Sequence, residues 1–210
     1  MMPNFDLSLI AVFLQQLILL IPAVSVHEYA HALAADILGD TTSRYAGRLT
    51  LNPAAHIDPM WTILLPLVLF VSTGGMFVFG SAKPVPIDYS RLRNPKRDII
   101  WIGIAGPLAN FCLAFVCFLL VKFFPGGLAG SLLATLGGIN VFLGVFNLLP
   151  VPPLDGSRVV AGILPESLSA AYLKLEPYGM VILVALLWFN VVNMFVLPLA
   201  SAIIRLFLSI

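Results

Sequence analysis

A His-Glu-x-x-His motif near the amino-terminal end is the strongest indication of chemistry in this sequence. His27 and His31 are four residues apart, and Glu28 directly follows the first histidine. On an α-helix, residues with this spacing lie one turn apart on the same face, so both imidazoles can bind one zinc ion. The carboxylate between them can hold a water molecule beside that ion and accept its proton. The motif therefore predicts a metal site that activates water for hydrolysis.

The motif ends an apolar segment that is long enough to cross a membrane. Residues 7–26 are interrupted mainly by Ser8, Gln15 and Gln16, and a bilayer core requires about 20 apolar residues in a helix. The first residues carry Asp6 and no positively charged region, so we expect a retained helix and not a cleaved signal peptide. A zinc helix in lipid indicates cleavage of peptide bonds inside the membrane, because a soluble metalloprotease does not need one.

The composition indicates a membrane protein with little soluble mass. Of its 210 residues, 60% are hydrophobic and 10% are charged, whereas soluble domains carry about 25% charged residues. We expect an all-α polytopic membrane protein with about four to six transmembrane segments. Residues 1–210 would form a single membrane-embedded domain, with a catalytic core at about 7–160 and C-terminal helices at about 178–210. The net charge of +1 and the absence of a long basic tract argue against nucleic acid as a partner.

The apolar runs and the turn residues between them predict the order of the segments. A first helix is expected from Leu7 to Leu38, and residues 178–210 form either one kinked helix or two segments split near Pro198. Residues 60–79 are apolar but broken by Pro66 and by a Gly-Gly pair, so a straight helix is not expected there. Further spans are predicted at 99–124 and 128–149.

Positively charged residues predict the orientation of these segments. They favour the cytoplasmic side, which places the basic loop 81–97, together with Arg44 and Arg48, inside. Residues 60–79 would then enter and leave on one side, as a small re-entrant or β-like element between the first helix and the 99–124 helix. Residues 74–80 could bind an unwound substrate by strand addition. The same orientation brings the residues after 149 to the cytoplasmic end of the histidine motif.

Asp155 is the predicted third metal ligand. A catalytic zinc site usually has three protein ligands and one water. Asp155 follows a proline-rich segment at a membrane boundary, where an ionised carboxylate costs about 2.5–3.5 kcal/mol unless it has a partner. Gly156 would allow close approach of the backbone. The alternative role of Asp155 is a helix N-cap.

Other polar residues leave alternatives open. His56 and Asp58 could form a second metal site or a structural hydrogen-bond network. Four asparagines in apolar runs could link helices through hydrogen bonds, namely Asn110, Asn140, Asn190 and Asn193.

These motifs together resemble the site-2 protease family of intramembrane zinc metalloproteases. The resemblance rests on the segment His27–His31 and on the Asn-x-x-Pro-x-Pro-Pro-Leu-Asp-Gly sequence that begins at Asn147. Supporting segments lie at 47–59, 82–87 and 105–110. The resemblance is to a compact form that lacks PDZ and CBS domains.

The resemblance implies a site and a function. It assigns one Zn²⁺ per chain to His27, His31 and Asp155, the role of general base to Glu28, and support of the substrate or transition state to Asn147 and Asn110. It also implies regulated intramembrane proteolysis in a prokaryotic inner or plasma membrane. The active site would lie near the cytoplasmic face, and the partner would be a membrane-protein substrate with an unwound transmembrane segment.

A non-catalytic zinc-binding scaffold or transporter is the alternative. A transporter needs polar residues along a path through the bilayer, whereas the ionisable residues here cluster at one depth. The identity of the substrate, the oligomeric state and the helices that would form a gate are left open by the sequence.

Overall fold

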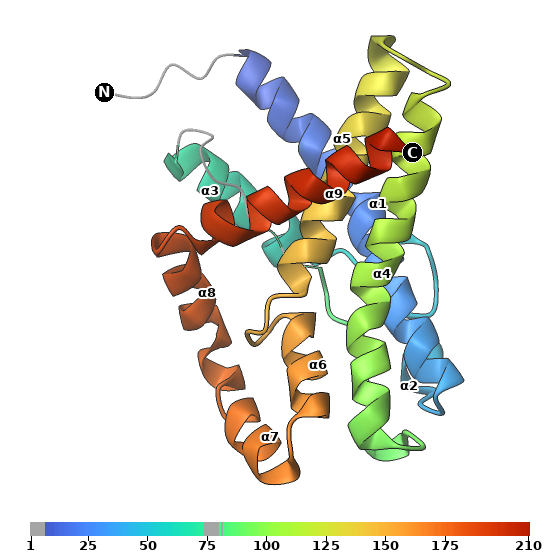
Figure 1. The fold of residues 1–210 in the computed structure, drawn as a ribbon, viewed down its shortest axis with the longest axis vertical. Helices are drawn as coiled ribbons and strands as arrows, with labels where there is room; N and C mark the ends of the chain where they lie inside the picture. Colours follow the sequence, from blue (N-terminus) through green and yellow to red (C-terminus); the bar gives the residue numbers. More distant parts are fainter. Residues whose placement is uncertain (1–6, 74–79, 81) are drawn as a thin grey trace.

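All regular secondary structure is helical in the residues that the computed structural model describes, which are 7–73, 80 and 82–210 (Figure 1). No β-strand occurs among these residues. The α-helices are α1 (Leu7–Ile37), α2 (Thr42–Tyr45), α3 (Leu65–Thr73), α4 (Pro95–Val121), α5 (Gly127–Asn147), α6 (Asp155–Ile163), α7 (Glu166–Leu173), α8 (Gly179–Trp188) and α9 (Leu197–Ser209). Short 3₁₀ or π-helical turns are η1 (Pro53–Ala55), η2 (Pro59–Leu64), η3 (Tyr89–Arg91), η4 (Glu176–Tyr178) and η5 (Val192–Val196).

Five helical stretches in the described part of the chain are long and apolar enough to cross a membrane. The prediction of an all-α polytopic membrane protein with four to six spans is therefore confirmed. The stretches are Leu9–Ile37, Pro95–Val121, Gly127–Asn147, Glu166–Trp188 and Val192–Ser209.

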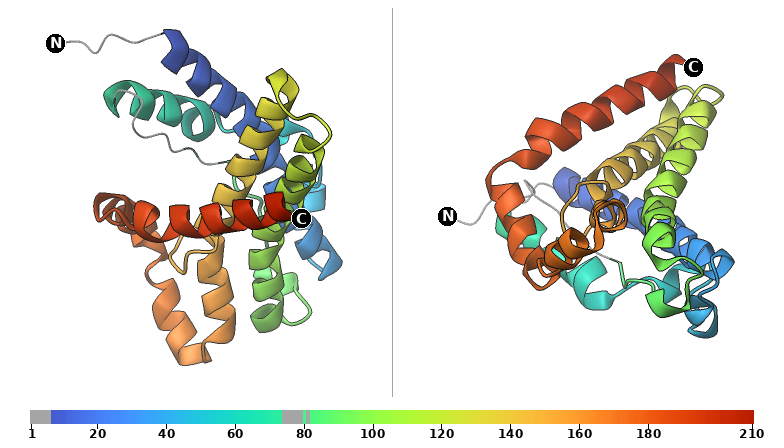
Figure 2. Two further views of the ribbon diagram at one scale, coloured as in Figure 1. Left: turned by 45° about the horizontal axis from the view of Figure 1, so that its top comes forward. Right: turned by 60° about the horizontal axis from the view of Figure 1, so that its bottom comes forward.

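Helices α1, α4 and α5 pack side by side and form the centre of the molecule (Figures 1 and 2). Small residues allow this close packing, because a Cβ atom added to Gly137 or Gly144 on α5 would lie within 3 Å of the rings of Phe118 or Phe111 on α4. Lipid tails are as apolar as the helices, so contact of this kind is a main source of helix association in a bilayer. It fixes α4 against α5.

The segment after α2 is irregular, as the sequence predicts. Asp58 caps η2 by accepting hydrogen bonds from the backbone N–H groups of Met60 and Trp61. The π-helical turn η2 then continues into α3, which is described as far as Thr73. Residues 74–79 lie outside the described residues, so the predicted re-entrant return and the strand addition at 74–80 stay predictions.

The C-terminal helices are divided at a different residue from the one predicted. The break lies at Asn190, which has a positive φ of 60° between α8 and η5. Pro198 does not interrupt the helical stretch Val192–Ser209, in which it closely follows the π-helical turn η5. Figure 1 shows α8 and α9 as separate segments, with α9 running across the bundle.

Candidate metal centre

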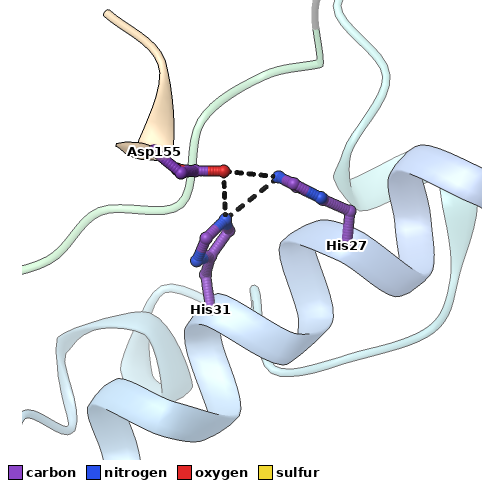
Figure 3. A group of neighbouring side chains, drawn as sticks. All are labelled: His27, His31 and Asp155. Atoms are coloured by element: carbon purple, nitrogen blue, oxygen red, sulfur yellow. Dashed lines mark hydrogen bonds and ion pairs between the residues drawn. The ribbon is translucent and has the colours of Figure 1, made fainter. Parts of the chain in front are cut away.

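Two turns of α1 and the first residue of α6 bring three side chains together, as Figure 3 shows. His27 Nε2 lies 3.0 Å from His31 Nε2 and 3.0 Å from Asp155 Oδ2. His31 Nε2 lies 3.1 Å from the same carboxylate oxygen. All three residues are buried, with exposed fractions of 7% or less. They are the only group of three potential metal ligands of this kind found in the described part of the chain.

The hydrogen bonds behind the two rings leave both Nε2 atoms as acceptors. His31 Nδ1 lies 2.7 Å from the carbonyl oxygen of Ile102, which can only accept, so Nδ1 carries the hydrogen. His27 Nδ1 lies 2.6 Å from Asn110 Oδ1 and donates in the same way. In neutral rings the Nε2 lone pairs then face each other and the Asp155 carboxylate. Such an arrangement of acceptors is suited to binding a cation between them.

The donor set and its spacing fit zinc. Zinc binds histidine nitrogen and carboxylate oxygen at about 2.0–2.2 Å, which separates tetrahedral ligand atoms by about 3.3 Å. The separations in the protein are 3.0–3.1 Å, a few tenths of an ångström shorter. The hydrogen bonds to Nδ1 are also the outer contacts that orient ligating histidines in metal sites. Two imidazoles and one carboxylate leave a fourth position for water.

Gly106 on α4 packs directly against the ligand atoms. A Cβ atom at this position would lie 2.3 Å from His31 Nε2 and 2.7 Å from His27 Nε2. Any side chain here would displace at least one ring. Gly106 lies in the motif at 105–110 but was not among the predicted site residues.

Asp155 is placed by the sharp turn between α5 and α6. It is the first residue of α6, with Leu154 at the N-cap position, so the alternative role of Asp155 as the N-cap is not found. A Cβ atom on Gly156 would lie 2.3 Å from the carbonyl oxygen of Leu148. The predicted close backbone approach at Gly156 is therefore confirmed, and it lets α6 start directly beneath the end of α5.

Glu28 contacts the extended segment 82–88. Its Oε2 accepts a hydrogen bond of 3.1 Å from the backbone N–H of Val85. This segment is itself held by Ser43, whose hydroxyl donates to the Pro86 carbonyl at 2.6 Å, and by Arg48, which donates to the Pro84 carbonyl at 3.2 Å. The carboxylate that follows the first ligand is thus tied to a fixed stretch of backbone.

The two asparagines predicted to support the substrate lie in different surroundings. Asn110 is fully buried and contacts the His27 ring. Asn147 lies at the end of α5, where its Nδ2 donates to the Leu143 carbonyl of the same helix at 3.0 Å. The structure therefore brings Asn110 to the candidate metal ligands and does not show Asn147 bonded to them.

His56 and Asp58 form structural hydrogen bonds. The His56 ring lies 2.8 Å from the Thr50 carbonyl through Nε2, and Asp58 caps η2. Neither belongs to a group of three metal-type side chains within the described residues. These contacts favour the structural alternative, although the buried Nδ1 of His56 has no hydrogen-bond partner.

Helical spans around a buried pair of histidines and a carboxylate define a multi-pass membrane protein with a candidate metal centre. The sequence profile described as peptidase family M50 matches residues 15–128 and 126–190. The chain belongs to this family. No solved structure matches the chain.

Three relatives have names that refer to zinc. The chain is 34% identical over 197 residues to "Putative zinc metalloprotease YwhC" of Bacillus subtilis (strain 168), covering 89% of this chain and 82% of that protein. It is 32% identical over 184 residues to "Putative zinc metalloprotease Rip2" of Mycolicibacterium smegmatis, covering 86% and 69%. It is 42% identical over 81 residues to "Zinc metalloprotease MJ0392" of Methanocaldococcus jannaschii, covering 38% and 23%.

Proposed function

We propose that this protein is an intramembrane zinc metalloprotease of the site-2 type. It hydrolyses peptide bonds within or near the membrane-spanning segments of other membrane proteins. The observation that carries the proposal is the convergence of Asp155, at the start of α6, with two histidines that lie on a helix long enough to span a bilayer. Membership of peptidase family M50 and the names of the relatives support the same activity.

His27, His31 and Asp155 would hold one zinc ion per chain. Bound zinc lowers the pKa of a coordinated water and polarises a carbonyl group. Glu28, the residue after His27, would accept the proton of that water and later donate it to the leaving amine. The Val85 N–H holds one oxygen of the Glu28 carboxylate in place for both transfers.

The position of the ligands in α1 supports cleavage inside the membrane. His27 and His31 lie ten and six residues before Ile37, the end of α1. At a rise of 1.5 Å per residue, these ligands are about 15 and 9 Å from the end of the helix. A peptide bond cleaved at this depth must come from a locally unwound segment, because a helix keeps its carbonyl groups in hydrogen bonds.

We also propose that the site opens toward the cytoplasmic face of a prokaryotic plasma membrane. The basic residues at the α2 end of α1 and at the start of α4 support this orientation, since positive charge favours the cytoplasmic side. These ends lie together at the bottom of Figure 1. The substrates would be membrane-tethered proteins, as in regulated intramembrane proteolysis.

A reconstituted reporter tests the activity. The reporter has one transmembrane segment between two tags, in a glycine- and proline-containing version that unwinds easily and in an all-leucine version. We expect cleavage of the first version within its transmembrane segment by the wild type, loss of cleavage with a chelator, and recovery when zinc is added. Glu28→Gln should bind zinc and cleave at least 100-fold more slowly, since general acid–base catalysis contributes about 10²–10⁴-fold.

Glu176→Gln is the matched control, because Glu176 is an exposed carboxylate outside the metal centre. It should cleave like the wild type. Equal cleavage by Glu28→Gln and the wild type would reject the assignment of the base. Zinc binding without cleavage of either reporter would favour the non-catalytic scaffold.

A further inference from the structure

Two asparagines behind the metal centre are completely buried. Asn110 lies in the middle of α4 and Asn140 in the middle of α5, and both have an exposed fraction of 0%. Amide groups inside membrane helices are unfavourable unless their hydrogen bonds are satisfied by the protein. The partners of these two side chains therefore indicate what the amides do.

The two amides form a continuous chain of hydrogen bonds that ends at a metal ligand. Asn140 Nδ2 donates to the carbonyl of Leu136 on its own helix at 2.8 Å. Asn110 Nδ2 donates to Asn140 Oδ1 at 2.7 Å and to the Ala23 carbonyl at 3.1 Å. Asn110 Oδ1 then lies 2.6 Å from His27 Nδ1. The chain links α5 to α1 through α4.

The partners fix the direction of every bond in this chain. The Leu136 carbonyl can only accept, so the NH₂ group of Asn140 faces it and the oxygen of Asn140 faces α4. Asn110 must then present its NH₂ group to Asn140 and to Ala23, which turns its oxygen toward His27. His27 Nδ1 is consequently the donor, and the lone pair of Nε2 points at His31 and Asp155.

We propose that Asn140 is a positioning residue of the metal centre. It acts through Asn110 to hold the His27 ring in the Nδ1–H tautomer that metal binding through Nε2 requires. The inference rests on the metal site of the proposed function, and it adds a residue on α5 to a site whose ligands come from α1 and α6.

The size of the effect follows from the number of bonds that fix each amide. Two acceptors hold the NH₂ group of Asn110, and removal of Asn140 leaves the Ala23 carbonyl alone. Loss of an outer contact to a metal-bound histidine lowers metal affinity about 10–100-fold. We expect zinc affinity to fall about tenfold in Asn140→Leu. It should fall about a hundredfold in Asn110→Leu, which removes the direct contact with the His27 ring.

The matched control is Thr135→Val on the same helix. Thr135 is also a polar link between α5 and α1, because its Oγ1 donates to the Ser131 carbonyl at 2.9 Å and lies 3.5 Å from Gln15 Nε2. It has no bond to the Asn110–His27 chain. Zinc affinity, measured by competition with a chelator, should stay within about twofold of the wild type.

Imidazole ¹⁵N spectra of the zinc-free protein provide a readout that a merely structural role would not change. The chain has three histidines, so each ring can be assigned with a single variant. At a pH where the rings are neutral, His27 should be the Nδ1–H tautomer in the wild type and in Thr135→Val, and a mixture of tautomers in Asn140→Leu. An unchanged tautomer together with unchanged zinc affinity in Asn140→Leu would overturn the proposal.

Two further variants keep the test decisive. Asn140→Asp should behave like the wild type, because a buried neutral carboxyl can donate to the Leu136 carbonyl and accept from Asn110. Asn140→Ser replaces Asn140→Leu if the latter does not fold, since a serine hydroxyl bonds to the carbonyl four residues earlier in its own helix and does not reach Asn110. Zinc affinity should then fall about tenfold in Asn140→Ser, as expected for Asn140→Leu.

The double variant Asn110→Leu/Asn140→Leu tests whether Asn140 acts through Asn110. Its zinc affinity should equal that of Asn110→Leu alone, because the shared path is already broken. Losses that multiply would overturn the proposal. Neither zinc affinity nor the tautomer of His27 depends on proteolysis. If the tautomers are as expected but no reporter is cleaved, the proposed activity is rejected while the positioning role of Asn140 is retained.

Discussion

The helices that surround the metal centre and the helices after residue 165 are built differently. In the most apolar stretches of α1, α4 and α5, 22%, 33% and 33% of the residues are buried within the protein, against 11% in those of 166–188 and 192–209. Around the metal centre, glycines touch side chains of neighbouring helices and buried amides are paired. In the C-terminal region, by contrast, Trp188 and Phe189 are 85% and 75% exposed.

This difference shows where the molecule requires precision. Three ligands that are far apart in the sequence must be held within a few tenths of an ångström, which only close packing can do. The C-terminal helices present large apolar side chains outward, which suits contact with lipid. We therefore expect zinc binding to be sensitive to the addition or removal of a few atoms in the helices around the metal centre. It should tolerate larger substitutions in the helices after residue 165.

The largest expected effect is the loss of zinc in Asp155→Ala. The wild type purified in detergent should contain about one zinc per chain, and the variant less than about a tenth of that, because two neutral imidazoles alone bind zinc weakly. Metal analysis of both proteins measures this. Asp88→Ala, which removes a carboxylate exposed at the surface, should keep its zinc. Retained zinc in Asp155→Ala would show that another residue is the third ligand.

Gly106→Ala should have the next largest effect, although it adds only a methyl group. The new Cβ would lie within 2.7 Å of both Nε2 atoms, so at least one ring must move away from the metal position. We expect zinc affinity to fall by at least about 100-fold, at the upper end of the losses seen when ligand orientation is disturbed. Chelator competition provides the measurement.

Gly138→Ala on α5 is the matched control for this substitution. A Cβ at Gly138 has no atom within 4 Å, so its zinc affinity should stay within about twofold of the wild type. Equal affinities of the two variants would contradict the close contact between α4 and the ligands.

The smallest expected effect concerns local stability and contrasts the two regions directly. In the proposed function zinc would join α1 to α6, so its removal by a chelator should increase amide hydrogen exchange in α6 by about tenfold, which corresponds to about 1.4 kcal/mol of local opening free energy. Exchange in α9 should not change, because α9 carries no ligand. Asp155→Ala should show no response to the chelator in either helix.

Much of the fold and the metal site could be predicted from the sequence, since both depend on local patterns. Apolar runs of membrane length gave the number of spans, and the spacing of His27 and His31 placed both on one helical face. Asp155 was predicted because an isolated carboxylate at a membrane boundary requires a partner. Of the two alternatives for 178–210, the split into two segments is found, but it lies at Asn190 and not near Pro198, because the backbone reverses to a positive φ at Asn190 whereas Pro198 lies within the continuous stretch Val192–Ser209.

The sequence by itself thus determined the class of protein, the approximate spans and the three candidate ligands, which follow from composition, helical periodicity and short motifs. Only the tertiary structure decided which residues surround the ligands. Gly106 touches the ligand atoms, and Asn140 bonds to Asn110 and not to some other helix, because of the way in which α1, α4 and α5 pack. Contacts between residues that are 30 to 124 positions apart depend on helix rotation and distance, which no local pattern specifies.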